Sequence, residues 1–230
     1  MTGGSDIPCV LVLAGLDPSG GGGLLADADA VRAAGARPLC VATALTVQTT
    51  RAARRFETAS PALVAETVRA LLEEEDVRAI KIGMIGDAGI AAAVEPLLPP
   101  RLPRVVDPVL FSTSGAPLLN GPADIYLRLA KNALLTPNLL EAEALGPDLL
   151  ARGPAAVLLK GGHRPGPTVV DTLQTRDAVE ELRADRLPVT KRGTGCRLAS
   201  FAAGKLALGA PLRDAVIEAR AYVRRYLAAP

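Results

Sequence analysis

Short apolar runs and helical patterns alternate along most of this sequence, and this alternation limits its fold more than any other feature. Six apolar runs have the length of strands: 10–14, 39–45, 79–82, 104–106, 133–136 and 155–159. Helical patterns lie between and after them, at 23–34, 61–72, 88–97, 123–129, 139–145, 195–207 and 211–227. This order is typical of a parallel sheet whose strands are joined by crossover helices. The sequence therefore predicts an α/β fold with a mainly parallel central sheet flanked by helices.

The 230 residues fit one large domain of this class. No internal repeat or linker divides the chain, so we expect a single domain over residues 1–230. The pattern changes between residues 168 and 190, where 169–173 and 182–189 resemble short strands of an antiparallel edge. Because ligands of open α/β sheets bind at the carboxyl ends of the strands, the turns that follow the predicted strands form the candidate site.

Composition and charge argue against a nucleic-acid or membrane partner. The formal net charge is +2, and three Phe, three Tyr and no Trp are too few aromatic rings for a base-stacking surface. The basic stretch 51–55 is short, and we interpret it as a solvated loop. No apolar run reaches the ~18 residues of a membrane helix. Residues 1–8 lack the pattern of a secretory signal, so we expect a cytoplasmic protein.

Cysteine and histidine usage excludes several kinds of site. Three cysteines without ligand spacing indicate neither a disulfide framework nor a zinc site. Cys9 and Cys40 lie in apolar runs, which predicts unreactive core thiols. His163 is the single histidine, so a Ser-His-Asp triad or a histidine-rich metal site would depend on that one residue. We therefore expect neither.

Two of the turns have both a structural and a functional interpretation. The glycine-rich segment 15–23 lets backbone N–H groups approach a ligand closely, although a flexible turn explains it equally well. It matches neither the nucleotide P-loop nor the dinucleotide fingerprint. Asn138 followed by Glu141 is a capping-box pattern, which is the interpretation we favour. The same pair at a strand end could also face a magnesium–phosphate site.

Two later turns suit an anion. Lys160 and Gly161 follow an apolar strand directly, where a lysine and a tight turn fit phosphate, although a plain strand exit explains them too. Small residues in 191–196 open a helix whose unpaired N–H groups and dipole would form an anion hole. Cys196, in the first turn of that helix, would then have a depressed pKa and could act as a base. The alternative is an ordinary helix cap followed by a buried cysteine.

The order of the motifs along the chain is more specific than any one of them. In sequence they are Ala14-Gly15-x-Asp17-Pro18-Ser19-Gly20-Gly21, Ala26-Asp27, Thr43-Ala44-Leu45-Thr46-x-Gln48, Lys81-Ile82-Gly83-Met84, Asp107-Pro108-Val109, Thr136-Pro137-Asn138-x-x-Glu141-Ala142, Lys160-Gly161-Gly162-His163 and Gly193-Thr194-Gly195-Cys196. This series resembles the hydroxymethylpyrimidine/phosphomethylpyrimidine kinases of thiamin biosynthesis, a branch of the ribokinase-like superfamily. The resemblance runs from about residue 10 to residue 227.

The resemblance implies a ribokinase-like three-layer sandwich, commonly a homodimer, that uses ATP and Mg²⁺ to phosphorylate hydroxymethylpyrimidine. It implies a substrate pocket lined by Gly15, Asp27, Gln48, Met84 and Val109. Gln48 is chemically suited to this pocket, because an amide can donate to one group and accept from another on an aminopyrimidine edge.

The resemblance also implies how the phosphoryl group is handled. Cys196 would be the base, and a thiol is adequate because phosphoryl transfer needs positioning and charge stabilisation more than a strong base. Sugar kinases of the superfamily usually have Asp at that position. The other implied residues are Gly193, Thr194 and Gly195 in the anion hole, Lys160, Asn138 and Gly161 at the ATP phosphates, and Asp107 and Glu141 at magnesium.

Three departures from the family pattern fall on the nucleotide side. Thr113-Ser114-Gly115 stands where the family commonly has Lys-Ser-Gly, which removes a cation near the phosphates. Thr190-Lys191-Arg192 replaces the usual Asn-Thr-His, and the segment between Glu141 and Lys160 is short.

Two alternatives to a hydroxymethylpyrimidine kinase stay open on the sequence alone. A pyridoxal or pyridoxine kinase acts on a substrate that is also a flat heteroaromatic ring with a hydroxymethyl arm. A non-catalytic relative would bind the pyrimidine as a sensor or partner module. Whether the pyrimidine monophosphate is a second acceptor is also open.

Overall fold

A nine-stranded sheet organises the part of the chain that the computed structural model describes, residues 7–112, 114–162 and 165–229. Thr113 and His163, which the sequence analysis singled out, lie outside those residues. The strand order is β11-β10-β9-β8-β6-β4-β1-β2-β3. The strands are β1 (Cys9–Leu16), β2 (Arg37–Gln48), β3 (Ala53–Thr58), β4 (Val77–Ile82), β6 (Arg104–Val106), β8 (Leu134–Leu135), β9 (Ala156–Leu159), β10 (Thr168–Thr175) and β11 (Val179–Asp185).

The centre of the sheet is parallel and both of its edges are antiparallel. From β2 through β1, β4, β6 and β8 to β9 each neighbouring pair is parallel. β3 pairs with β2 in the antiparallel sense, and so does β10 with both β9 and β11. The short strands β5 (Gly86–Asp87) and β7 (Leu119–Asn120) pair separately from this sheet. The predicted parallel sheet and its antiparallel edge at β10 and β11 are confirmed.

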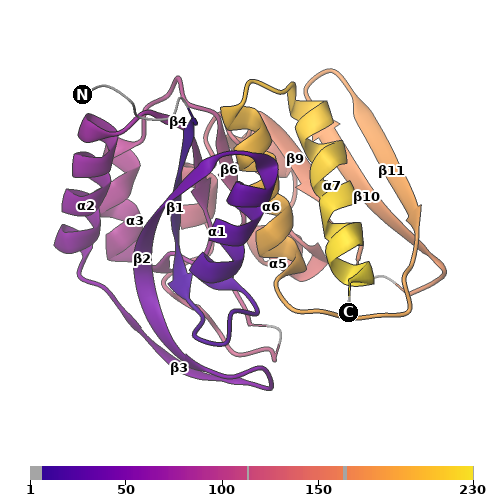
Figure 1. The fold of residues 1–230 in the computed structure, drawn as a ribbon, viewed down its shortest axis with the longest axis horizontal. Coiled ribbons are helices and arrows are strands. Elements are labelled where there is room, and N and C mark those ends of the chain that lie inside the picture. Colours follow the sequence, from indigo (N-terminus) through magenta and orange to yellow (C-terminus); the bar gives the residue numbers. More distant parts are fainter. Residues whose placement is uncertain (1–6, 113, 163–164, 230) are drawn as a thin grey trace.

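Helices cover both faces of the sheet, which gives three layers (Figure 1). One face carries α1 (Gly23–Ala34), α6 (Thr194–Ala207) and α7 (Leu212–Ala228). The other carries α2 (Pro61–Glu74), α3 (Ala88–Val94), α4 (Ile125–Leu129) and α5 (Leu139–Leu145), with the short helices η1 (Glu95–Leu97) and η2 (Leu149–Arg152). Because side chains alternate along a strand, β1 sends Leu11 and Leu13 into one core and Val10 and Val12 into the other.

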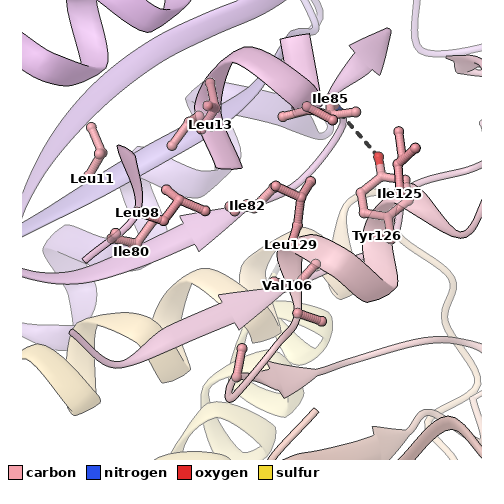
Figure 2. Close-up of a cluster of buried hydrophobic side chains, with 14 of the residues drawn as sticks. Leu11, Leu13, Ile80, Ile82, Ile85, Leu98, Val106, Ile125, Tyr126 and Leu129 are labelled. Carbon is pink, nitrogen blue, oxygen red and sulfur yellow. Dashed lines mark hydrogen bonds between the residues drawn. The ribbon is translucent and has the colours of Figure 1, made fainter. Parts of the chain in front are cut away.

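Tyr126 connects the core to the loops at the carboxyl ends of the strands (Figure 2). Its ring is fully buried among the side chains of one core. The backbone N–H of Ile85 donates to its hydroxyl at 3.1 Å. The hydroxyl lies 3.1 Å from the carbonyl oxygen of Gly83 and 3.2 Å from that of Val109, to either of which it can donate. One side chain therefore fixes two loops that reach the candidate site.

Two sequence predictions about exposed segments were wrong. The stretch 51–55 was predicted as a solvated loop, but residues from 53 onward form β3, which pairs with β2 as a hairpin. Cys40 was predicted as a core thiol, but it is exposed, because it lies on β2 near the edge of the sheet. Cys9 is buried as predicted. Among the described residues, no helix has the length and apolarity that crossing a membrane requires.

Candidate active site

The predicted site residues gather at the carboxyl ends of the parallel strands, around the first turn of α6. Gly15 is the second-last residue of β1, Gln48 ends β2, and Met84 follows β4. Asp107 follows β6, and Lys160 follows β9. An open α/β sheet binds its ligands at this edge, so the fold brings together turns that lie far apart in the sequence.

The glycine-rich loop between β1 and α1 packs closely against the start of α6. Gly193, the N-cap of α6, has a φ of 70°, and a Cβ there would lie 2.0 Å from the carbonyl oxygen of Gly21. Gly23 has a φ of +60°, and a Cβ there would lie 2.2 Å from the carbonyl oxygen of Gly15. Only glycine fits either position. The loop therefore has a packing role. Its glycines let the backbone of the loop contact the backbone at the start of α6 and at the end of β1.

The start of α6 has the properties of an anion hole. Gly193 has no side chain to cap the helix, and no acidic residue lies in the first turn. The N–H groups of Thr194, Gly195 and Cys196 therefore have no side-chain cap, and the helix dipole adds positive potential. A Cβ on Gly195 would lie 3.0 Å from the Nζ atom of Lys160, so glycine lets this turn approach a cation.

Cys196 differs from the sequence prediction in its acidity. Burial, together with the charges of Asp27 and Asp107, raises the pKa of the thiol to about 11. The charge of Lys81 and a hydrogen bond from the backbone of Gly23 oppose this rise without cancelling it. The predicted depression of the pKa was therefore wrong, because desolvation and the two nearby carboxylates outweigh the groups that lower the pKa. Cys196 is a protonated thiol at neutral pH.

Lys160 and Asp107 form the charged centre of the site. The Nζ atom of Lys160 lies 2.6 Å from Oδ1 of Asp107 and 3.9 Å from Oε2 of Glu141. Burial opposes both charges, but Lys160 lowers the pKa of Asp107, and the two carboxylates raise the pKa of Lys160. Thr136 adds a hydroxyl 3.3 Å from Oδ1 of Asp107. The cluster therefore carries a lysine cation directly beside the first turn of α6.

Glu141 belongs to a capping box, as the sequence analysis favoured. Its backbone N–H donates to Oδ1 of Asn138 at 2.9 Å, and the backbone N–H of Asn138 donates to Oε2 of Glu141 at 2.7 Å. Burial raises the pKa of Glu141 to about 7, since the charge of Asp107 adds to the desolvation and Lys160 only partly offsets it. Glu141 therefore changes charge near neutral pH, and a phosphate role of Asn138 stays a prediction.

The donor set is compatible with a magnesium ion that is bound mainly by a nucleotide. Among the described residues, no group of three or more His, Cys, Asp or Glu side chains could hold a metal by itself. Asp107 and Glu141 nevertheless face the same lysine, so the fold brings two carboxylates to one point. Magnesium commonly takes one or two carboxylates and completes its coordination with phosphates and water.

Gly161 does not offer its backbone to a phosphate as the resemblance implied. Its N–H donates to Oδ1 of Asp171 at 2.7 Å. A Cβ at this position would lie 1.9 Å from the carbonyl oxygen of Val170. Glycine is needed there because β10 passes directly against the turn after β9. Gly161 is therefore a packing residue at the contact between this turn and β10.

A small apolar cluster lies against Gly15, at the end of β1. Met84 and Ala44 are buried there together with Leu118, and Phe56 and Val109 pack against them half-buried. A Cβ on Gly15 would lie 2.6 Å from the sulfur of Met84. The structure thus brings together three of the predicted substrate residues, Gly15, Met84 and Val109.

Gln48, the last residue of β2, lies beside Asp17. Its Nε2 atom donates to Oδ2 of Asp17 at 3.2 Å. Arg192 reaches the same oxygen from the loop before α6, also at 3.2 Å, and its other nitrogen donates to the carbonyl oxygen of Thr49 at 2.8 Å. Three loops therefore meet around the carboxylate of Asp17, next to Gln48, the residue predicted to bind the pyrimidine.

Asp27 does not line a pocket, and this implied role is wrong for the structure described here. Its carboxylate is fully buried under the site, with one oxygen 2.7 Å from the Nζ atom of Lys81 and the other accepting from the hydroxyl of Ser200 at 2.8 Å. Burial raises the pKa of Asp27, although Lys81 and Ser200 work against this rise. The pair joins α1, β4 and α6 beneath the anion hole.

Among the site residues that the sequence analysis missed or left without a role are Asp17, Lys81, Arg192, Phe56 and Tyr126. A lysine inside the apolar run 79–82 was a usable signal, because a charge buried in a strand needs a partner. Phe56 follows an arginine pair, which hid its strand. The contacts of Arg192 and Tyr126 depend on loops that only the folded chain brings together.

Comparison with known proteins agrees with this geometry. The family model of phosphomethylpyrimidine kinase matches residues 17–230. The chain belongs to this family. A hydroxymethylpyrimidine/phosphomethylpyrimidine kinase of Rhizobium meliloti is 36% identical in an alignment 239 positions long, which covers 95% of this chain and 90% of the relative. The resemblance stated from the sequence motifs is confirmed.

Solved structures show the same fold. The phosphomethylpyrimidine kinase of Clostridium difficile 630 superimposes with a TM-score of 0.80 at 31% identity, covering 96% of this chain and 99% of that one. The pyridoxal kinase of Staphylococcus aureus in complex with pyridoxal gives a TM-score of 0.85 at 23% identity, covering 96% of this chain and 88% of that one. The second likeness concerns the fold alone. The predicted ribokinase-like three-layer sandwich is confirmed.

Proposed function

We propose that this member of the phosphomethylpyrimidine kinase family transfers a phosphoryl group from ATP to the hydroxymethyl oxygen of 4-amino-5-hydroxymethyl-2-methylpyrimidine, in thiamin biosynthesis. The observation that carries the proposal is the junction at the start of α6. Gly193 packs against Gly21 on one side of it, and Gly195 lies against Lys160 on the other. The helix start therefore lies between the glycine-rich loop and a buried cation, where the charge of a transferring phosphoryl group can be stabilised.

The acceptor would occupy the side of this junction that the glycine-rich loop forms. Gly15, Met84 and Val109 would contact the flat ring, and Gln48 would bind its polar edge. Cys196 would take the hydroxyl proton. Because the transition state is loose, the proton leaves late and a sparse thiolate suffices. Since the pKa of Cys196 is raised to about 11, the rate of the chemical step should rise with pH across the neutral range.

The nucleotide would occupy the charged side. Lys160 would neutralise charge on the phosphates, and Asp107 and Glu141 would hold magnesium. When bound, magnesium would neutralise phosphate charge that Lys160 alone cannot balance. The capping box keeps Glu141 pointed back toward the start of α5, so its carboxylate stays near Lys160 without any ligand.

The two alternatives are less well supported. The relatives that carry the pyrimidine kinase name reach 36% identity, whereas the pyridoxal kinase of similar fold reaches 23%. A non-catalytic pyrimidine-binding module would need no cation beside the helix start, yet Lys160 lies within contact of Gly195. Both observations favour the pyrimidine kinase. The monophosphate of the pyrimidine remains a second candidate acceptor.

Ligand-dependent thermal unfolding tests the proposed pocket. A ligand that binds only the folded state raises the melting temperature with its occupancy. Hydroxymethylpyrimidine should raise it in the absence of nucleotide, and pyridoxal at the same concentration should raise it less. A larger shift with pyridoxal would favour the pyridoxal kinase, and no shift with either ring would contradict the assignment of the apolar cluster.

The expected homodimer belongs to the same proposal. Leu45 and Val47 of β2 are large apolar side chains that are exposed in the single chain, at 59% and 45%. A second copy that covered them would remove apolar area from water. Light scattering during size-exclusion chromatography should give twice the 23.7 kDa mass of the chain, and a single-chain mass would contradict the proposal.

A further inference from the structure

The amide of Gln48 has only one orientation that its neighbour allows. Its Nε2 atom lies 3.2 Å from Oδ2 of Asp17. A carboxylate oxygen can accept a hydrogen bond but cannot donate one. The amide nitrogen must therefore face Asp17, and a flipped amide would place two acceptor oxygens against each other.

Hydrogen-bond donors on both oxygens hold the carboxylate of Asp17 in one orientation. It is 3% exposed. Its Oδ1 atom accepts from the backbone N–H and the hydroxyl of Ser19, at 2.9 and 2.6 Å. Its Oδ2 atom accepts from the backbone N–H of Gly22 at 3.1 Å and from the guanidinium of Arg192 at 3.2 Å. The carboxylate is therefore a rigid reference for Gln48, held by the glycine-rich loop and by the loop before α6.

This arrangement determines what Gln48 can offer to a ligand. A primary amide has two N–H donors and one carbonyl acceptor. With one N–H directed to Asp17, the carbonyl oxygen and the other N–H remain. A 4-aminopyrimidine presents the complementary pair, because its ring nitrogen accepts and its amino group donates. A 4-oxopyrimidine presents the reverse pair in its lactam form, since its ring N–H donates and its oxygen accepts.

We infer that Asp17 is a specificity-determining positioning residue, which selects a 4-aminopyrimidine over a 4-oxopyrimidine by holding the Gln48 amide in one orientation. The inference rests on the proposed function, because it requires Gln48 to face the acceptor ring. Arg192 supports Asp17 with its charge and also binds the carbonyl oxygen of Thr49, next to Gln48 in the chain. The aminopyrimidine preference thus depends on a residue that need not touch the ring.

The test compares the 4-amino and 4-oxo forms of 5-hydroxymethyl-2-methylpyrimidine as acceptors. The wild-type protein should favour the amino form. Asp17→Asn can present either a donor or an acceptor to Gln48, so the amide is free to flip. The ratio of kcat/KM for the two acceptors should fall about tenfold or more, as expected when a hydrogen-bonding pattern is no longer enforced. Ser19→Ala removes the hydroxyl contact to Oδ1 and the 3.3 Å contact of Arg192 with the Ser19 hydroxyl, but it leaves all three Oδ2 contacts in place, so it should keep the wild-type ratio.

A second variant covers the case in which Asp17→Asn folds poorly because Arg192 loses its partner. Asp17→Asn combined with Arg192→Gln removes both charges, and it should show the same fall in the acceptor ratio.

The outcomes separate this inference from the function on which it rests. A wild-type protein that phosphorylates neither acceptor contradicts the proposed function. A wild-type preference that survives in the folded Asp17 variants overturns the inference and leaves the function intact. A fall of equal size in Ser19→Ala would also overturn it, because the effect would then come from the loop and not from the amide orientation.

Discussion

The two sides of the candidate site are built from different interactions. On the acceptor side, close packing fixes the shape, with Gly15 against Met84 and Gly21 against Gly193. On the nucleotide side, a lysine is shared between two carboxylates, at 2.6 Å from Asp107 and 3.9 Å from Glu141.

This difference predicts which property of the protein variants on each side should change. The acceptor side has its shape and its hydrogen-bond pattern before any ligand binds, so variants there should change which ring is accepted. The nucleotide side balances its charges internally, and a triphosphate must disturb that balance. Variants there should change the dependence on pH and magnesium. Cys196 lies at the junction, where either side can affect it.

Cys196→Ala should have the largest effect, because it acts at the junction of the two sides. It should lower kcat by about 10²–10⁴, the usual range for losing a positioned acid–base group. Affinity for the ring and for ATP should stay nearly unchanged, since alanine is small and suits a helix. Cys196→Asp should retain more activity than Cys196→Ala. A wild-type turnover rate in the alanine variant would show that neither side depends on the thiol.

Alkylation of the thiol gives a separate measure of the same residue. Cys40 is exposed and would react as well, so a Cys40→Ser background is needed. The thiolate is the reactive form, and the pKa of Cys196 is raised to about 11. Inactivation by iodoacetamide should therefore accelerate up to about that pH, and bound hydroxymethylpyrimidine should protect. A rate that levels off near pH 8 would contradict the assigned burial of the thiol.

Gln48→Ala tests the acceptor side, and its expected effect is smaller than that of Cys196→Ala. The ligand's polar edge would lose its partner, which costs about 1–3 kcal/mol of binding free energy. Titration calorimetry should show this loss for hydroxymethylpyrimidine and little change for ATP. Equal losses of binding free energy for both ligands would contradict the division of the site into an acceptor side and a nucleotide side.

Glu141→Gln tests the nucleotide side and should have the smallest effect on the folded state. Glutamine can still cap the helix, so the melting temperature at low pH should stay near that of the wild type. The pKa of Glu141 is raised from 4.5 to about 7 in the folded protein, so the folded state binds the proton more tightly than the unfolded state does. Wild-type stability should therefore fall as pH rises between those two values, and it should fall less in the variant.

The same variant tests the magnesium assignment. If Glu141 contributes to the ion, the variant should need more magnesium to reach half of its maximal rate. An unaltered magnesium dependence together with an unaltered pH profile of stability would show that the carboxylate serves only the capping box.

Local patterns predicted the elements and caps of this molecule well. The helix Gly23–Ala34 and the helix Leu139–Leu145 have the predicted bounds, and the capping box of Asn138 and Glu141 is present. These features depend on residues within a few positions of each other. Apolar periodicity and side-chain capping are read from such short windows.

The predictions that were wrong depend on contacts between distant segments. Asp27 and Lys81 are 54 residues apart, and nothing local shows that they form a buried pair. The raised pKa of Cys196 follows from desolvation and from the charges of Asp27 and Asp107, which are distant in the sequence. Cys40 lies in an apolar run, but exposure depends on which strands end up near an edge. The sequence therefore predicted the participants in the site better than their charges and surroundings.

The turnover of the wild-type protein tests the central claim most directly. Purified protein would be incubated with magnesium, ATP and hydroxymethylpyrimidine, and ADP and phosphorylated pyrimidine would be quantified by chromatography with mass detection. The account predicts equal amounts of the two products, with less product from pyridoxal or pyridoxine under the same conditions. Failure to phosphorylate any of hydroxymethylpyrimidine, its monophosphate, pyridoxal and pyridoxine would contradict the kinase assignment and favour a binding module.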